Sequence, residues 1–156
     1  MGQLLYEDMT WAPSEAMSAK TESETLMNAM LPLAEQMLRR GGEFHPYGGY
    51  MKPDGIIVDV GAEDTDTDRP KSKDLIYLLR SSFHEMVDKG QCKAVALIFN
   101  VVVNLPDSDR KSDAIQVCVD HAEGYSAEVF FPYRVVNDKV IYGQVFAQEG
   151  KYEFFA

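Results

Sequence analysis

The sequence predicts an α+β fold, with two amphipathic helices packed on one face of a mostly antiparallel sheet of about six strands. Apolar residues recur at helical spacing in two segments, whereas the last third of the chain alternates apolar and polar residues between short turns. The order of these patterns is helix, hairpin, helix and a four-strand meander, which favours antiparallel pairing. A chain of 156 residues without an internal repeat or linker is expected to form one domain over residues 21–156, after an irregular arm over residues 1–20.

The first helix is expected to begin near Thr21, because Thr21 and Glu24 have the spacing of a capping box. Pro32 lies inside the apolar stripe and is expected to kink the helix or divide it. Gly41-Gly42 is a typical helix stop. The buried stripe is expected to contain Leu26, Met30, Leu33 and Met37.

A β-hairpin and a second helix follow. Aromatic residues lead into the turn sequence Pro53-Asp54-Gly55 and then into a β-branched run at residues 56–58. The second helix is expected between Pro70, which suits a first helical turn, and Gly90, which suits a stop. Its buried face is expected to contain Leu75, Leu79, Phe83 and Met86.

The remainder of the chain is expected to form four strands. The first of them, residues 92–104, is nearly all apolar, as in a central strand covered on both faces. The other three are expected over residues 113–121, 126–135 and 139–147, separated by turns at Glu123-Gly124 and Asn137-Asp138. The core positions expected on these strands are Leu97, Phe99, Val101, Ile115, Val117, Val129 and Phe131.

The net charge of −10 comes from 25 acidic and 15 basic residues. Residues 1–68 carry 13 acidic and 4 basic residues, so most of the excess lies in this part of the chain. Such a charge repels nucleic acid and anionic membrane surfaces, which bind through Lys and Arg. It favours a basic protein as partner, although acidity also serves simply to keep a small protein soluble.

The sequence also predicts a compartment. No apolar run reaches the roughly 18 residues that a membrane helix needs. Acidic residues stand near the N-terminus, where a signal peptide would have basic ones. Two cysteines cannot form a disulfide framework, and eight methionines fit a reducing compartment. We therefore expect a cytoplasmic protein that does not bind membranes.

An acidic loop is the first candidate for a site. Asp64, Asp66 and Asp68 have the spacing that begins an EF-hand calcium loop. Arg69 stands where that loop needs glycine, and Leu75 stands where it needs a bidentate glutamate. We therefore interpret the three aspartates as a solvated acidic surface that would contact a basic partner.

Other motifs do not indicate catalysis. His84 and Asp88 have the spacing of the zinc-protease helix, but that motif needs a second His, and a polar pair of this kind is ordinary helix surface. Cys92 and Cys118 lack a C-x-x-C partner and are expected to be small buried side chains. The chain has no phosphate-loop, dinucleotide-binding or nucleophile-elbow motif. We expect no catalytic residues, no metal ligands and no cofactor.

A second candidate site lies in the segment Glu43–Tyr50. There His45 stands beside aromatic residues and two glycines, so that His45, Tyr47 and Tyr50 could line a ligand pocket. Arg134 would add an anion-binding group if the two strands lie close together. The alternative is that the tyrosines belong to the core and that His45 is a hydrogen-bonded residue at the edge.

Three stretches resemble a family of small bacterial proteins. They are an F-x-P-[FY]-G strand at residues 44–48, a D-A-I-x-V strand at residues 113–117 and a P-Y-R strand end at residues 132–134, and the resemblance covers about residues 43–150. That family carries no assigned activity. The resemblance therefore implies a bacterial, cytoplasmic origin, and no catalytic residues can be carried over from it.

These observations favour a small acidic cytoplasmic protein-binding module without catalytic activity, which would neutralise or escort a basic protein partner as immunity proteins do. The alternative is a small-ligand-binding protein or an unrecognised enzyme, with its pocket at His45, Tyr47, Tyr50 and Arg134. A homodimer with a structural role is the third interpretation.

Overall fold

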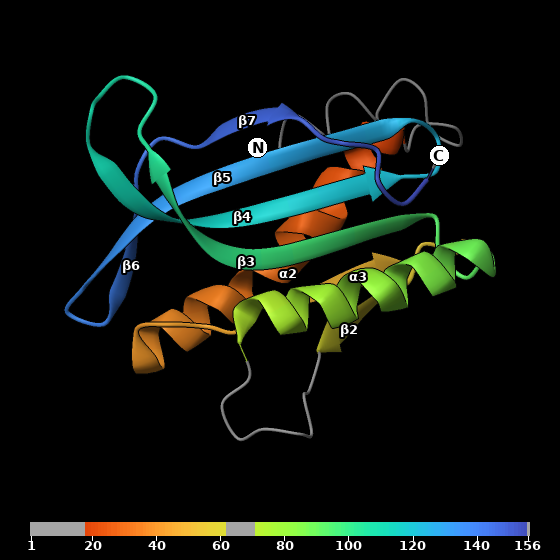
Figure 1. Cartoon of the computed structure of the whole chain (residues 1–156), viewed down its shortest axis with the longest axis horizontal. Coiled ribbons are helices and arrows are strands. Elements are labelled where there is room, and N and C mark those ends of the chain that lie inside the picture. The colour runs from red at the N-terminus through yellow and green to blue at the C-terminus, as the bar shows by residue number, and fades with distance from the viewer. Residues whose placement is uncertain (1–17, 62–70, 156) are drawn as a thin grey trace.

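The computed structural model describes residues 18–61 and 71–155, which form two helices and seven strands (Figure 1). All strand pairings among them are antiparallel. The expected α+β class and order of elements are confirmed, but the sheet has seven strands rather than about six. The elements are α2 (Ala19–Gly41), β1 (Tyr47–Met51), β2 (Ile57–Gly61), α3 (Ser72–Asp88), β3 (Ala94–Asn104), β4 (Lys111–His121), β5 (Tyr125–Val136), β6 (Lys139–Tyr142) and β7 (Phe146–Glu149).

The seventh strand arises because the expected strand over residues 139–147 is broken. The sheet order is β2-β1-β3-β4-β5-β6, and β7 also pairs with β5. β6 pairs with the end of β5 and β7 with its beginning, so the two short strands follow one another along one edge. At the break, Gly143 donates its N–H to the carbonyl of Pro132 (2.8 Å), and Pro132 has no N–H to donate in return. Proline at this point of β5 therefore interrupts the ladder.

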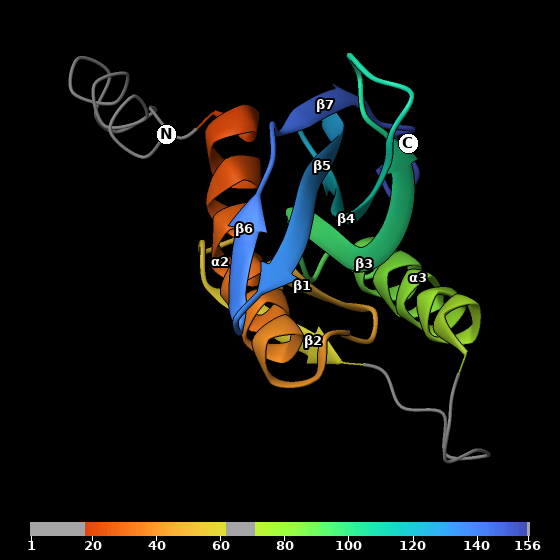
Figure 2. The ribbon, with the colours of Figure 1, turned by 90° about the vertical axis from the view of Figure 1, so that its left-hand side faces the viewer.

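The two helices lie on opposite faces of the sheet, so the prediction that they share one face was wrong. A Cβ atom built on Gly48 would lie 2.7 Å from Phe83 of α3, whereas one on Gly49 would collide with the sulfur of Met30 of α2 and lie 2.9 Å from its Cε. Successive residues of a strand point to opposite faces, so α2 and α3 approach β1 from opposite sides. Figure 2 shows the same arrangement, with β1 and β3 between the helices. Each helix therefore builds its own core.

The helix α2 begins earlier than expected. Ser18 is the N-cap, and its hydroxyl accepts from the N–H of Thr21 (3.1 Å), so Thr21 lies inside the first turn. The helix continues through Pro32 without being divided. The expected stop is confirmed, because Gly42 takes a left-handed conformation (φ 76°) and donates to the carbonyl of Leu38 (2.9 Å).

Most of the expected core positions are buried. Leu33 is an exception, because it is 40% exposed on the outer side of α2. The expectation of a strand covered on both faces holds for the first half of β3, residues 94–98, which is buried throughout. In the second half, half-buried residues such as Phe99 and Val101 alternate with exposed ones. The end of β3 is therefore only partly covered on either face of the sheet.

The predicted turns are confirmed where the structure describes them. Gly55 and Gly124 have positive φ angles of 93° and 91°, and Asn137 and Asp138 both adopt φ > 0, as a two-residue hairpin turn of type I′ requires. Neither of the described helices combines the length and the apolar composition that crossing a membrane would require.

Candidate functional site

The four residues of the predicted ligand pocket are not brought together. His45 is exposed in the segment before β1. Tyr47 and Tyr50 lie on opposite faces of β1, because they are three positions apart along the strand, and they pack in different cores. Arg134 is exposed near the end of β5 and lines a hollow to which none of the other three contributes.

Tyr47 has a structural role in α2. Its hydroxyl donates to the carbonyl of Met30 (2.5 Å) and accepts from the N–H of Ala34 (3.1 Å). In a regular α-helix, these two groups would be hydrogen-bonded to each other, because they are four residues apart. The tyrosine thus satisfies backbone groups on either side of Pro32, where the proline ring crowds the preceding turn. Burial raises the pKa of Tyr47 far above its usual value, so the hydroxyl keeps its proton.

The glycines beside Tyr47 are needed for packing. At Gly48 an added Cβ would lie 2.5 Å from the carbonyl oxygen of Ala96 as well as against Phe83. At Gly49 it would meet Met30. Both helices therefore contact the sheet at the same dipeptide, one from each face, and only residues without a side chain fit there.

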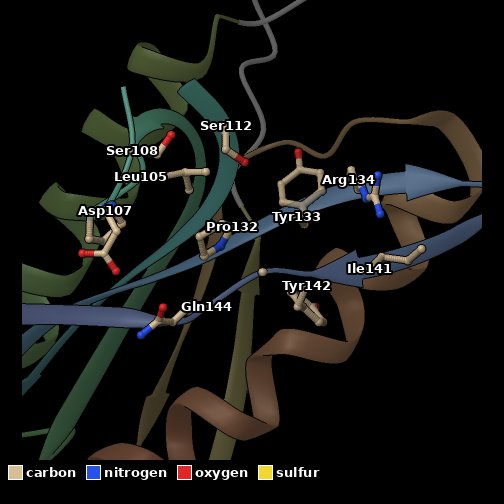
Figure 3. Close-up of a pocket in the computed structure, with 12 residues that line it drawn as sticks. Leu105, Asp107, Ser108, Ser112, Pro132, Tyr133, Arg134, Ile141, Tyr142 and Gln144 are labelled. Atoms are coloured by element: carbon tan, nitrogen blue, oxygen red, sulfur yellow. The ribbon is translucent and has the colours of Figure 1, made fainter. Parts of the chain in front are cut away.

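The hollow that contains Arg134 has a volume of about 410 Å³ and lies between the loop after β3 and the ends of β5 and β6 (Figure 3). Arg134 and Asp107 stand at opposite margins in this view. The hydroxyl of Ser112 donates to the carbonyl of Asp113 (2.8 Å), and that of Tyr133 donates to Asn100. The hydroxyl groups of this hollow are thus bonded to the protein itself, whereas its two charged side chains, Arg134 and Asp107, form no ion pair with a described residue and carry opposite charges.

A larger hollow, of about 620 Å³, lies on the sheet face opposite α2. We call it the C-terminal hollow, because residues 150–154 form one of its walls. Its floor is formed by β3, β4 and β5, and Arg80 of α3 closes another side. Its size lies within the range that small-molecule and side-chain pockets occupy.

The C-terminal wall is held by a set of directed bonds. Asp120 accepts from the hydroxyl of Ser126 (2.6 Å) through one oxygen and from the N–H of Phe154 (3.0 Å) through the other. Ser126 in turn accepts from the N–H of Tyr152 (3.2 Å). Glu153 forms an ion pair with Arg80 and, through the other oxygen, lies within hydrogen-bond distance of Nε2 of His84 (3.1 Å). His84 therefore contacts the C-terminal segment and not a metal-binding partner on its own helix.

Glu128 is the least balanced charge in the C-terminal hollow. It lies on β5 directly opposite Cys118 of β4 and is only 8% exposed. One oxygen accepts from the amide of Gln148 (2.7 Å), while the other has no hydrogen bond within residues 18–61 and 71–155. No base among these residues forms an ion pair with it. A buried carboxylate without a cation is costly, so this group stands out as a binding group.

The thiol beside Glu128 is not an activated nucleophile. Burial, together with the negative charges of Glu128 and Asp120, raises the pKa of Cys118 to about 11. Burial also raises the pKa of Cys92. Both side chains therefore stay protonated at neutral pH, where a reactive cysteine would be a thiolate.

A buried charged cluster ties α2 to the sheet. Glu22, in the first turn of α2, accepts from Lys93 (2.5 Å) through one oxygen and from Nε2 of His121 (2.8 Å) through the other. Nδ1 of His121 accepts from the N–H of Glu123 (3.0 Å), so Nε2 carries the ring proton. With both nitrogens engaged, His121 has no free lone pair to act as a base, and the cluster is structural.

Neither charged site was predicted from the sequence. Glu22 and His121 are 99 residues apart. Glu128 lies among the apolar residues of its strand, and because it directly precedes Val129, the alternation along the strand places these two side chains on opposite faces. Asp64, Asp66 and Asp68, the predicted partner-binding residues, lie outside the described residues.

The described part of the chain contains no group of three or more His, Cys, Asp or Glu side chains arranged to hold a metal ion. Comparison of the chain with family models, with curated proteins and with solved structures found no match. The resemblance to a bacterial family therefore stays a prediction, and a function has to be inferred from the residues and their arrangement.

Proposed function

We propose that the protein is a non-catalytic, cytoplasmic binding module whose partner is a basic protein. The observation that carries this proposal is the large acidic excess that the fold leaves unneutralised. The chain has a net charge of −10, and within residues 18–61 and 71–155 the ion pairs engage only three carboxylates, those of Glu22, Glu85 and Glu153. A negative field of this kind accelerates encounter with a basic partner and repels nucleic acid.

The state of the reactive side chains supports a role without catalysis. The two thiols have raised pKa values, and His121 has both nitrogens engaged. His84 is bonded to Glu153. These groups hold the fold together or stay protonated, whereas nucleophilic and general-base catalysis need a group that is free and tuned to its task.

A small ligand is the second candidate function. The observation that favours it is the volume of the C-terminal hollow, about 620 Å³, together with its mixture of charged and aromatic walls. In this alternative the ligand would bind there rather than beside His45 and Tyr47.

Capture experiments test the proposal. The tagged full-length protein is incubated with lysate of the organism that encodes it and is washed at low and at high salt. We expect a single basic protein that is released as the salt concentration rises, since screening weakens exposed charge pairs. Absence of any basic protein from the eluate of the folded bait would contradict the proposal.

Two variants show which surface is used. Replacing Asp64, Asp66 and Asp68 by lysine should weaken capture if the acidic loop contacts the partner. His45→Ala should leave capture unchanged, because His45 is exposed and lies apart from both hollows.

A further inference from the structure

We propose that the C-terminal hollow receives one lysine or arginine side chain of the partner, with the carboxylate of Glu128 as its anchor. This inference rests on the proposed function, since it assigns the basic partner a defined point of contact. It is carried by the balance of charges in the hollow and by the nature of its walls.

The described residues leave one carboxylate oxygen in the hollow without a partner. Glu153 is paired with Arg80. Both oxygens of Asp120 are used, by Ser126 and by the backbone of Phe154. Glu128 keeps one oxygen that accepts no hydrogen bond from a described residue, although its side chain is more than nine-tenths buried. An incoming ammonium or guanidinium group would therefore give this oxygen a donor and the carboxylate a cation.

The walls suit a long aliphatic side chain that ends in a cation. Phe99 lines the floor from β3, Phe154 lines the C-terminal wall, and Cys118 is a small apolar neighbour of Glu128 with its proton retained. Lysine and arginine pack their methylene stems against such surfaces while the charged end meets a polar group. Aromatic rings within reach of the cation add to the attraction.

Lys151 is the remaining charged side chain that lines the hollow. It is exposed and forms no ion pair with a described residue. Lys151 would repel an incoming cation and would attract an anion. Replacing Lys151 therefore changes the affinity for a cation and for an anion in opposite directions. A cation site gains affinity when Lys151 is replaced, whereas an anion site loses it.

The test uses the ¹⁵N-labelled full-length protein and two small probes. Nα-acetyl-lysinamide carries the proposed side chain, and Nα-acetyl-norleucinamide has a similar aliphatic stem without the charge. We expect saturable shifts of amide signals from residues 118–128 and 150–154 with the lysine probe and much smaller shifts with the norleucine probe. The shifts map the hollow independently of any partner.

Glu128→Gln is the decisive variant. The side-chain oxygen of the glutamine can still accept the hydrogen bond from Gln148, so the substitution removes the charge and leaves the strand pairing in place. This variant should bind the lysine probe about tenfold or more weakly than the wild type. Glu123→Gln removes the same charge from an exposed turn and should have little effect. Lys151→Met should strengthen binding. Thermal unfolding of each variant verifies that the fold is retained.

The outcomes separate this inference from the proposed function. Equal binding of the lysine probe by wild type and Glu128→Gln would overturn the inference, and so would loss of binding in Lys151→Met. Salt-sensitive capture of a basic protein that is unaffected by Glu128→Gln would leave the proposed function standing and overturn the hollow as the contact. Binding of the probe without capture of any basic protein would support the hollow and contradict the proposed function.

Discussion

The hydroxyl of Tyr47 donates to the carbonyl oxygen of Met30 at 2.5 Å and so links the first strand to the middle of α2. The same hydroxyl accepts from the N–H of Ala34, which completes the connection across the turn that contains Pro32. A proline that would weaken an isolated helix is thus tolerated because a side chain from the sheet bonds the backbone around it.

Tyr47→Phe should destabilise the protein by about 1–3 kcal/mol, because a buried carbonyl and a buried N–H lose their partner. Urea unfolding followed by circular dichroism measures the change. Tyr77→Phe is the matched control, since Tyr77 is 70% exposed on α3 and its removal should leave the free energy of unfolding unchanged. Equal stability of the two variants would show that the hydroxyl of Tyr47 contributes nothing.

Gly150→Ala should loosen the C-terminal wall of the hollow. An added Cβ would collide with the hydroxyl of Ser126 and lie 2.8 Å from the backbone nitrogen of Ala127. We expect a loss of about 1–3 kcal/mol in stability and faster hydrogen exchange at the amide of Phe154. In the control variant Gly41→Ala, the added Cβ has no neighbouring atom within 4 Å, so hydrogen exchange at the amide of Phe154 should stay as in the wild type. Unchanged exchange at Phe154 in Gly150→Ala would refute the close approach.

Cys118 should react slowly with iodoacetamide in the folded protein. With a pKa of about 11, only about one thiol in a thousand is a thiolate at pH 8. In a Cys92→Ala background, alkylation should be far slower in the folded protein than after unfolding in urea. Glu128→Gln should speed it, because the negative charge of Glu128 contributes to the raised pKa. Identical rates with and without Glu128 would place the carboxylate away from the thiol.

The stability that Glu22 provides should depend on pH. Burial disfavours its charge, but hydrogen bonds from Lys93 and His121 outweigh that effect and hold the pKa of Glu22 below its ordinary value of 4.5. A carboxyl group whose pKa is lower in the folded state contributes fully above about pH 4.5, and this contribution is lost as the pH falls through the folded pKa. Melting temperatures of wild type and Glu22→Gln should therefore differ at pH 7 and converge toward pH 3. Glu43→Gln, at an exposed position, should follow the wild type. A constant difference between wild type and Glu22→Gln would rule out this linkage.

Elements with a local cause could be predicted from the sequence. Gly55, Gly124 and the Asn137-Asp138 pair each determine a turn through their own backbone preferences, and the two helices follow from apolar spacing. The side of the sheet that each helix covers depends on contacts between distant segments. Its only trace in the sequence was Gly48-Gly49, which reads equally well as a flexible loop.

Most of the candidate site could not be predicted from the sequence, because it also depends on contacts between distant segments. The turn at Gly124 determines that Cys118 faces Glu128, so this pair could have been found from the hairpin register. The wall formed by residues 150–154 could not, because it depends on Asp120 accepting from the backbone of Phe154, 34 residues later. The predicted pocket failed because it joined residues by composition, and alternation along β1 sends Tyr47 and Tyr50 to opposite faces.

Quantitative capture by three baits is the sharpest test of whether Glu128 binds a basic partner. Wild type, Glu128→Gln and Glu123→Gln are tagged, incubated with the same lysate and compared by mass spectrometry of the eluates across a salt series. We predict one basic protein, released by salt, that is retained by wild type and Glu123→Gln and depleted with Glu128→Gln. Eluates without a basic protein, or equal retention of it by all three baits, would contradict binding of a basic partner through Glu128.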